Sequence, residues 1–152
     1  MKKLLHILQL NFLPHSADAG LLVLRLWLGL SLLLLHGKAK LLGFAELSQK
    51  FPDPLGVGST ASLALAVFAE VVCSSLLALG LVTRFAALSA GIMLGVAFFL
   101  VHKASLAMGP HSGELALIYL AGFVTLLIAG PGRFSLDACV PRTRAVEKAA
   151  AA

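Results

Sequence analysis

Four long apolar stretches, each with at most one charged residue, constrain this chain more than any other feature. They cover approximately residues 19–36, 60–82, 85–101 and 115–130. A helix needs roughly 20 apolar residues to cross the bilayer core, and about 17 to 25 are tolerated. The stretches therefore predict four membrane-spanning helices, of which the fourth is short and has to include Glu114 or residues after Gly130.

The composition supports the same class. Hydrophobic residues make up 59% of the 152 residues and charged residues 12%, whereas soluble domains are roughly half apolar and a quarter charged. A chain of this length forms one domain. We expect an all-α fold, an integral membrane four-helix bundle over residues 19–137. An N-terminal interfacial arm would cover residues 1–18, and a disordered cytoplasmic tail residues 138–152.

The N-terminus has some features of a cleaved signal peptide, because two lysines precede an apolar run. That run is interrupted by His6, Gln9 and Asn11, which a signal peptide would not carry. At helical spacing Leu5, Leu8 and Phe12 share one face, and polar residues share another. The segment therefore predicts a short amphipathic helix in the headgroup layer.

The distribution of lysine and arginine predicts the orientation. The N-terminus, the second loop and the tail hold seven of these residues (Lys2, Lys3, Arg84, Arg133, Arg142, Arg144 and Lys148), and the other side holds four (Lys38, Lys40, Lys50 and Lys103). Cytoplasmic segments carry the excess, so both termini should lie in the cytoplasm and the bundle in the plasma (inner) membrane. This rule and anionic lipid explain the net charge of +5, and no nucleic-acid partner is needed.

Arg25 and Glu70 are the only charges inside their stretches, the first and the second. With the predicted boundaries they lie within roughly 5 Å of one depth. Each is costly alone in the bilayer, so the sequence predicts that they pair. Two interpretations stay open: the pair only fixes how two helices dock, or it belongs to a functional site.

Small residues recur on the faces of two stretches. In the second stretch they flank Glu70 at four-residue intervals, at Ser62, Ala66, Ser74 and Ala78. In the third stretch Ala87, Gly91 and Gly95 repeat the pattern. Such stripes predict close contact between helices, and therefore a compact bundle with a polar interior rather than a wide pore.

A second polar group is expected at the outer ends of the spans, where His36, His102 and Glu114 lie. Imidazoles and carboxylates can carry protons or hold a polar ligand. The candidate catalytic residues are therefore Glu70, His36 and His102, and the candidate ligand-binding residues are Arg25, Glu70 and Glu114. The alternative is that they are ordinary interfacial residues, with Glu114 a first-turn acid beside a Ser112 cap.

Metal and nucleotide motifs are missing from the sequence. It holds no HxxxH, CxxC, GxSxG or phosphate-loop pattern, so we expect no metal site, and two histidines on different helices leave a bis-histidine haem open. The two cysteines, Cys73 and Cys139, lie in different regions and do not indicate a disulfide. Cys73 is expected to be a small buried residue.

Three segments carry a family resemblance: LRLWLGLSLLLLHGKAKLLGF, LAVFAEVVCSSLLALGLVTRFAAL and GELALIYLAGFVTLLIAGPGRFSLD. In this order they resemble the DoxX family of small four-helix membrane proteins, over about residues 20–137. The matching positions are Arg25, Gly29, His36, Gly37, Lys38, Glu70, Gly80, Leu81, Arg84, His102, Glu114, Gly130, Gly132, Ser135 and Asp137. After Glu70 many relatives are rich in glycine, whereas this chain has Cys73, Ser74 and Ser75.

The resemblance implies membership in a group often described as oxidoreductase subunits. The family name comes from a subunit of an archaeal thiosulfate:quinone oxidoreductase, and bacterial relatives are linked to complexes that handle thiol oxidative stress. Remote relatives act as cargo receptors or assembly chaperones without redox chemistry.

Three functions therefore stay open. The chain is a membrane redox subunit that binds a quinone or a small sulfur oxyanion, a non-catalytic scaffold or accessory subunit, or a conduit for protons or small solutes. The expected partners are the lipid bilayer, soluble or membrane redox subunits, and a second copy of the chain.

Overall fold

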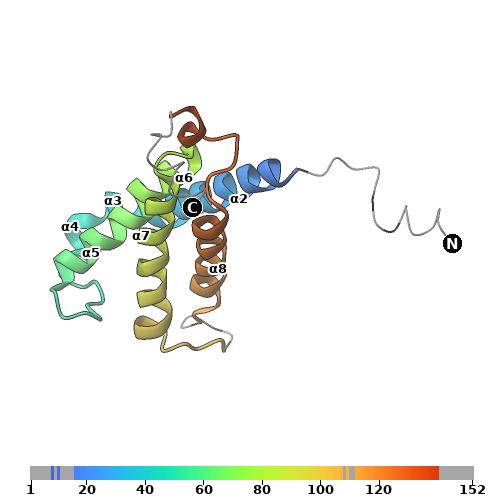
Figure 1. The fold of residues 1–152 in the computed structure, drawn as a ribbon. Coiled ribbons are helices and arrows are strands. Elements are labelled where there is room, and N and C mark those ends of the chain that lie inside the picture. The colour runs from blue at the N-terminus through green and yellow to red at the C-terminus, as the bar shows by residue number, and fades with distance from the viewer. Residues whose placement is uncertain (1–7, 9, 11–15, 108, 110–111, 141–152) are drawn as a thin grey trace, which may run out of the picture.

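The computed structural model describes residues 16–107, 109 and 112–140, with Leu8 and Leu10, and its regular elements are all helical (Figure 1). Three helices are long and apolar enough to cross a membrane, Ala17–Leu42, Ser59–Leu79 and Thr83–Val101, and Glu114–Ala129 is a shorter apolar helix. The predicted all-α membrane fold is confirmed. The arm predicted for residues 1–18 and the tail predicted for residues 138–152 lie mostly outside the described residues.

Each of the three long helices contains a π-helical segment. The first consists of α2 (Ala17–Ser31), η1 (Leu32–Gly37) and α3 (Lys38–Leu42), and α4 (Phe44–Leu47) follows it. The second consists of α5 (Ser59–Val67), η2 (Phe68–Cys73) and α6 (Ser74–Leu79), and the third of α7 (Thr83–Val96) and η3 (Ala97–Val101). The fourth is α8 (Glu114–Ala129), and the short helix η4 (Leu136–Cys139) comes after it.

The first helix is longer than the sequence predicted. It was expected to end at His36, but it continues to Leu42 and includes Lys40. The residues after His36 contain no proline, and lysine, alanine and leucine favour helices. Lys40 therefore belongs to the bundle and not to the loop.

The turn between α6 and α7 is closed by a glycine and by a distant carboxylate. Gly80 has a left-handed backbone (φ 71°), and the N–H groups of Gly80 and Leu81 donate to Leu77 and Leu76, which is a Schellman C-cap. The carboxylate of Asp137 accepts hydrogen bonds from the N–H groups of Val82, the N-cap of α7, and of Thr83, its first residue. The C-terminal segment thus caps the third helix.

The long helices pack as two crossing pairs. α2 packs along α6, and η1 along η2, whereas α7 packs along α8. Figure 1 shows that the α7 and α8 pair runs across the other pair rather than parallel to it. The core between the pairs includes Leu32, Leu77, Leu94, Phe98 and Phe123.

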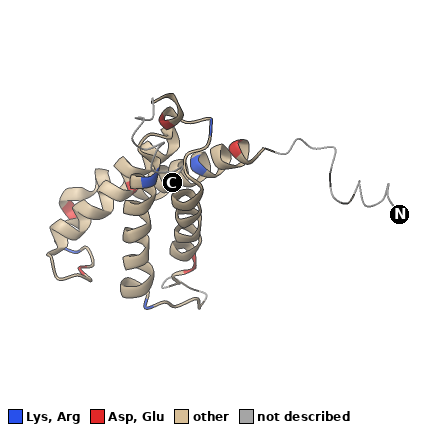
Figure 2. Ribbon diagram, viewed as in Figure 1, with Lys and Arg blue, Asp and Glu red and all other residues tan. Residues whose placement is uncertain are grey.

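The predicted stripe of small residues faces this interior, and the outer surface is apolar. Ser62, Ala66 and Ser74 are buried, so the predicted close contact is confirmed for the second helix. Outward-facing large side chains such as Trp27 (74% exposed) and Ile128 (74% exposed) cover the helices. Charged residues gather mostly toward the helix ends and loops (Figure 2). A surface of this kind fits a lipid environment.

Candidate functional site

A cavity of about 630 Å³ lies between the two helix pairs. Most of its lining is apolar and comes from η1, α5, η2, α7, η3 and α8, with side chains that include Leu32, Phe68, Met93 and Ala97. The loop after α4 adds Phe51, Pro52, Pro54 and Leu55. Cavities of a few hundred Å³ with apolar walls and a few polar groups are typical of small-molecule sites.

Four side chains that can carry charge line this cavity: His36, Lys40, Glu70 and His102. His36 lies in η1, Glu70 lies in η2, and His102 directly follows η3. π-helical segments are rare and often occur at functional sites. In the described part of the chain, two of the three π-helical segments thus contain a polar side chain that lines the cavity, and the third ends directly before one.

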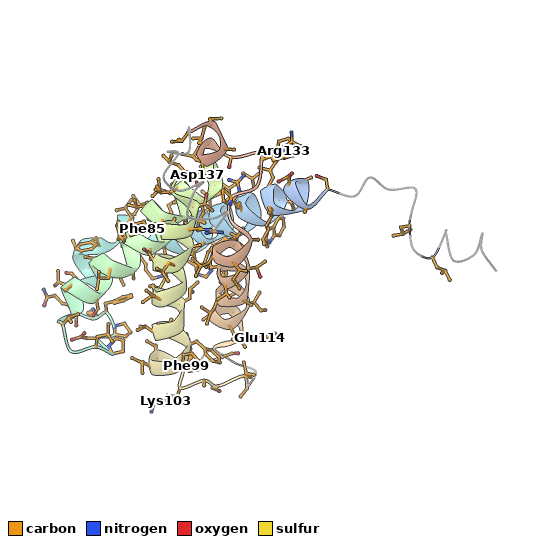
Figure 3. The ribbon with its side chains drawn as sticks, in the orientation of Figure 1. Phe85, Phe99, Lys103, Glu114, Arg133 and Asp137 are labelled. Carbon is orange, nitrogen blue, oxygen red and sulfur yellow. The ribbon has the colours of Figure 1, made fainter. Side chains whose placement is uncertain are left out.

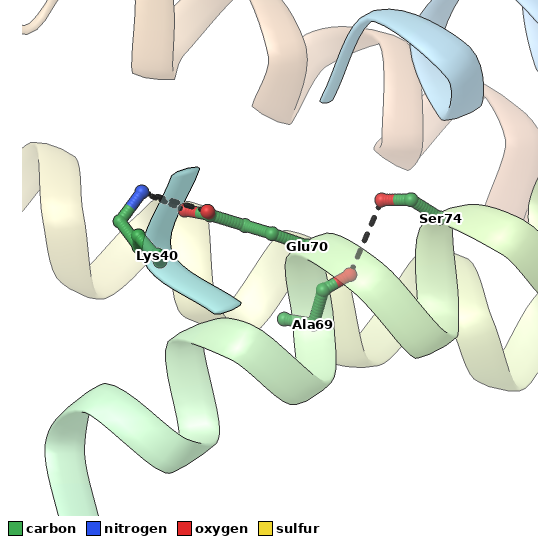
Figure 4. A network of polar contacts seen from close by, with 4 residues as sticks. All are labelled: Lys40, Ala69, Glu70 and Ser74. Atoms are coloured by element: carbon green, nitrogen blue, oxygen red, sulfur yellow. Dashed lines mark hydrogen bonds and ion pairs between the residues drawn. The ribbon is translucent and has the colours of Figure 1, made fainter. Parts of the chain in front are cut away.

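Glu70 forms an ion pair with Lys40 (Figure 4). The Nζ atom of Lys40 lies 2.8 Å from Oε1 and 2.7 Å from Oε2 of Glu70. The Glu70 side chain is 7% exposed and that of Lys40 is 23% exposed. The predicted partner of Glu70 was Arg25, and that prediction is wrong.

The packing of the first two helices explains this correction. A Cβ atom on Gly37 would lie 2.6 Å from the carbonyl oxygen of Glu70, and one on Gly29 would lie 2.7 Å from that of Ser74. Glu70 therefore lies opposite Gly37, and the twelve residues from Arg25 to Gly37 correspond to roughly 18 Å of helix. The two charges are at different depths, and Lys40, one turn after Gly37, is the cation that reaches Glu70.

Arg25 is fully buried at the other end of the bundle. Its Nη1 donates to the carbonyl oxygen of Leu77 at 3.2 Å, in the last turn of α6, and its Nη2 donates to that of Phe134. A Cβ atom on Gly80 would lie 2.1 Å from Nη1, so only glycine leaves room for the guanidinium. Arg25 does not line the cavity. Its contacts favour the structural interpretation, in which it joins α2, α6 and the C-terminal segment.

Asp137 completes the polar cluster at the Arg25 end. Its Oδ1 accepts from the N–H of Val82 at 2.7 Å, and its Oδ2 from that of Thr83 at 2.8 Å. Burial opposes ionisation of this carboxyl group, but hydrogen bonds from Thr83 and Val82 and the charge of Arg25 outweigh it and hold the pKa of Asp137 below its ordinary value. Asp137 is one of the positions of the family resemblance, but the sequence suggested no role for it.

The predicted outer group converges only in part. His36 and His102 line the same cavity, whereas Glu114 is exposed and is not among the lining residues. Glu114 lies in the first turn of α8, as the first-turn alternative predicts, and its N–H donates to Oγ of Ser112 at 3.2 Å, but the N-cap residue is Gly113 and not Ser112. Figure 3 shows Glu114 and Lys103 at the end of the molecule opposite Arg133 and Asp137.

His36 also contacts an aromatic side chain from the fourth helix. Its ring meets that of Tyr119 edge to face, with the centroids 6.0 Å apart. The Tyr119 hydroxyl donates to Oγ of Ser31 at 2.8 Å. Both rings line the cavity. The contact with Tyr119 therefore limits the rotation of the His36 ring at the cavity wall.

The loop that completes the cavity wall is held by Asp53. Its carboxylate accepts hydrogen bonds from the Ser62 hydroxyl at 2.8 Å, from the N–H of Gly58 at 2.7 Å and from that of Val57 at 3.0 Å. The bonds from Ser62 and Gly58 hold the pKa of Asp53 below its ordinary value. The same bonds fix the loop against α5.

Neither cysteine belongs to the site. Cys73 is a free thiol, fully buried in the core as predicted, and Cys139 is free and exposed near the Arg25 end. Among the described residues, no three histidine, cysteine or acidic side chains come together in a group that could hold a metal ion.

Comparison with known proteins agrees with the family resemblance seen in the sequence. The model of the DoxX family matches residues 20–103. Two proteins of Haemophilus influenzae, both described as uncharacterized, are similar to the chain. One is 33% identical over 101 residues, 65% of this chain and 67% of the relative. The other is 35% identical over 108 residues, 68% of this chain and 78% of the relative. No solved structure matches with statistical significance.

Proposed function

Since the chain belongs to the DoxX family, we propose that it is a subunit of a membrane redox system and that its cavity binds a quinone. The observation that carries this proposal is the combination of an apolar cavity with proton-carrying side chains inside a lipid-exposed bundle. A quinone has the matching chemistry, an apolar body with two carbonyl oxygens. When bound, it would accept two electrons from the oxidation of thiols or thiosulfate, together with two protons, which the thiols release or which, with thiosulfate, come from water.

The residues that line the cavity fit such a ligand. The apolar walls from α7, η3 and α8 would pack against its body, and the polar side chains His36, Lys40, Glu70 and His102 would face its oxygens. His36, His102 and Glu70 are the proposed proton carriers, because imidazole and carboxylate groups can be tuned to exchange protons near neutral pH. Arg25 and Glu114, which the sequence suggested as ligand-binding residues, do not line this cavity and are not assigned to it.

The proposal includes the membrane and its orientation. Arg84 and Arg133 belong to the end of the bundle that holds Asp137, and the positive-inside rule favours that end as the cytoplasmic one. Both termini would then be cytoplasmic and the chain would lie in the plasma membrane. Electrons would come from a soluble or membrane partner subunit.

The alternative functions have less support. A scaffold does not need a cavity of this size with polar groups in its wall. A conduit needs a path past the Arg25 layer, where the guanidinium is fully buried against Gly80 and the carbonyl oxygens of Leu77 and Phe134.

Quinone extraction tests the proposed function. The protein would be purified in mild detergent, and bound quinones and lipids would be identified by mass spectrometry. Ala97→Phe places a ring in the cavity wall, and Ala121→Phe makes the same change on an exposed face of α8 away from the cavity. We expect quinone with the unmodified protein and Ala121→Phe, and little with Ala97→Phe. No quinone in any of them, or equal amounts in all three, would contradict the proposal.

A further inference from the structure

The ion pair between Lys40 and Glu70 leaves one donor available at the cavity. A lysine ammonium carries three N–H donors and no acceptor. Two contacts, at 2.8 and 2.7 Å, go to the two oxygens of Glu70. These are its hydrogen bonds within the described part of the chain. Because Lys40 lines the cavity, the remaining N–H can reach a ligand there.

Glu70 holds this donor in place. Gly37 lets the backbones of η1 and η2 come together at Glu70, and Lys40 follows Gly37 by about one turn on the same helix. The Glu70 side chain, at 7% exposure, is the more deeply buried partner. The ammonium is therefore restricted to the cavity wall. An unpaired lysine at this position would instead extend toward the membrane surface.

The net charge of the pair determines which head group the cavity can accept. The positive charge of Lys40 is balanced by a carboxylate in direct contact with it. A small anion would gain one hydrogen bond from Lys40 but would meet the charge of Glu70 in a medium of low dielectric constant. An uncharged carbonyl oxygen gains the same hydrogen bond without that repulsion.

We propose that Lys40 is the head-group donor of this cavity and that its pairing with Glu70 selects ligands with an apolar body and an uncharged carbonyl acceptor over sulfur oxyanions and other anions. This inference rests on the proposed function and names the ligand class for it. The sulfur compound would then be oxidised at a partner subunit and not in this cavity.

Ligands that share one alkyl chain but differ in their head groups can test the selectivity. Binding of radiolabelled decylubiquinone would be measured in nanodiscs, with decylsulfonate as the anionic competitor and decyltrimethylammonium as the cationic one. We expect decylubiquinone to bind the unmodified protein and decylsulfonate to compete at least tenfold more weakly. Decylsulfonate that competes as well as unlabelled decylubiquinone would overturn the selectivity.

Variants of the pair test the role of each side chain. Lys40→Met should weaken decylubiquinone binding about tenfold, since a hydrogen bond from a charged donor is lost. Glu70→Gln keeps the donor and removes the negative charge, so it should raise the affinity for decylsulfonate by about tenfold. The double variant Lys40→Met/Glu70→Leu leaves no unpaired buried charge. It should fold and bind decylubiquinone as weakly as Lys40→Met.

The outcomes separate this inference from the proposed function. If the unmodified protein binds decylubiquinone, Ala97→Phe does not, and the folded double variant binds it as tightly as the unmodified protein, then the cavity binds quinone but Lys40 is not the donor. If the unmodified protein does not bind decylubiquinone, the proposed function fails together with the inference.

Discussion

Arg25 donates a hydrogen bond to the carbonyl oxygen of Leu77, 3.2 Å away, in the last turn of α6. The charge inside the first apolar stretch is thus balanced by the negative end of a helix, by the carbonyl oxygen of Phe134 and by the nearby Asp137. A carboxylate in the neighbouring span is not needed. The result is a structural joint at one end of the bundle and a separate ion pair at the cavity.

Arg25→Met should destabilise the protein strongly. The carbonyl oxygens of Leu77 and Phe134 would lose a buried donor, which costs about 1–3 kcal/mol for each group. Arg84→Met is the control, because within the described residues that exposed guanidinium makes one hydrogen bond, of 3.3 Å, to the carbonyl oxygen of Ile128. Thermal unfolding in detergent should show a large decrease in melting temperature for Arg25→Met and a small decrease for Arg84→Met. Similar losses would contradict the structural role of Arg25.

The separation of Arg25 from Glu70 gives an independent prediction. Sites without shared partners have additive effects, within about 0.3–0.5 kcal/mol. The double variant Arg25→Met/Glu70→Gln should therefore be destabilised by the sum of the single changes. A coupling well above that range would mean that the two charges interact after all.

The sequence was enough to predict the helices but not the arrangement of the site. The apolar stretches are long and nearly free of charge, so the helices followed directly from them. The relative depth of Arg25 and Glu70 did not, because it depends on the close approach at Gly29 and Gly37, which a single helix does not reveal. His36 and Lys40 are four residues apart, and this spacing was the available signal that Lys40 shares the face of His36.

The Arg25 end shows the same limit. Asp137 was visible as part of the C-terminal pattern, but its contacts with Val82 and Thr83 join residues more than fifty positions apart. Hydropathy gives no information on such a contact, because Asp137 and Thr83 lie outside the apolar stretches and Val82 is the last residue of one. For Glu114, by contrast, the local sequence was enough to predict a first-turn position with a hydrogen bond to Ser112, although Gly113 and not Ser112 is the N-cap.

Gly37→Ala should destabilise the protein by about 1–3 kcal/mol, as overpacking commonly does. The added methyl group would lie 2.6 Å from the carbonyl oxygen of Glu70, so η1 and η2 would have to separate. Gly95→Ala is the matched control, since a methyl group there meets no atom within 4 Å and alanine favours the helix. In thermal unfolding, Gly37→Ala should have a lower melting temperature than the unmodified protein, and Gly95→Ala an equal or higher one. The reverse order would contradict the packing of the first two helices.

Lys40 and Glu70 should be energetically coupled. Lys40→Met leaves a carboxylate that is only 7% exposed without its cation, whereas Glu70→Leu leaves a lysine that is 23% exposed and can turn outward. The first change should therefore be the more destabilising one at neutral pH. The double variant should recover part of the loss, with a coupling energy of about 0.5–3 kcal/mol in a double-mutant cycle. A coupling of zero would show that the pair does not stabilise the fold.

The stability of the Arg25 end should depend on pH through Asp137. The pKa of Asp137 is lower in the folded protein than its ordinary value of 3.8, so its contribution is complete above that value and is lost as the pH falls through the folded pKa. At neutral pH, Asp137→Ala should cost about 0.5–2 kcal/mol, the usual loss for an N-cap. The difference from the unmodified protein should shrink in acid below pH 3.8. Unfolding curves for both proteins across this range would measure it, and a difference independent of pH would exclude the charged cap.

The two native cysteines allow a test of the orientation. Cys139 is exposed and lies in η4, whereas Cys73 is fully buried and should not react in the folded protein. If the Arg25 end is cytoplasmic, a membrane-impermeant maleimide should label Cys139 only after the cells are permeabilised. In a Cys139→Ala background, Leu55→Cys places an exposed thiol in the loop after α4, and this variant should be labelled in intact cells. The opposite pattern would place the termini outside. It would also put Arg84 and Arg133 on the side where the positive-inside rule does not favour them.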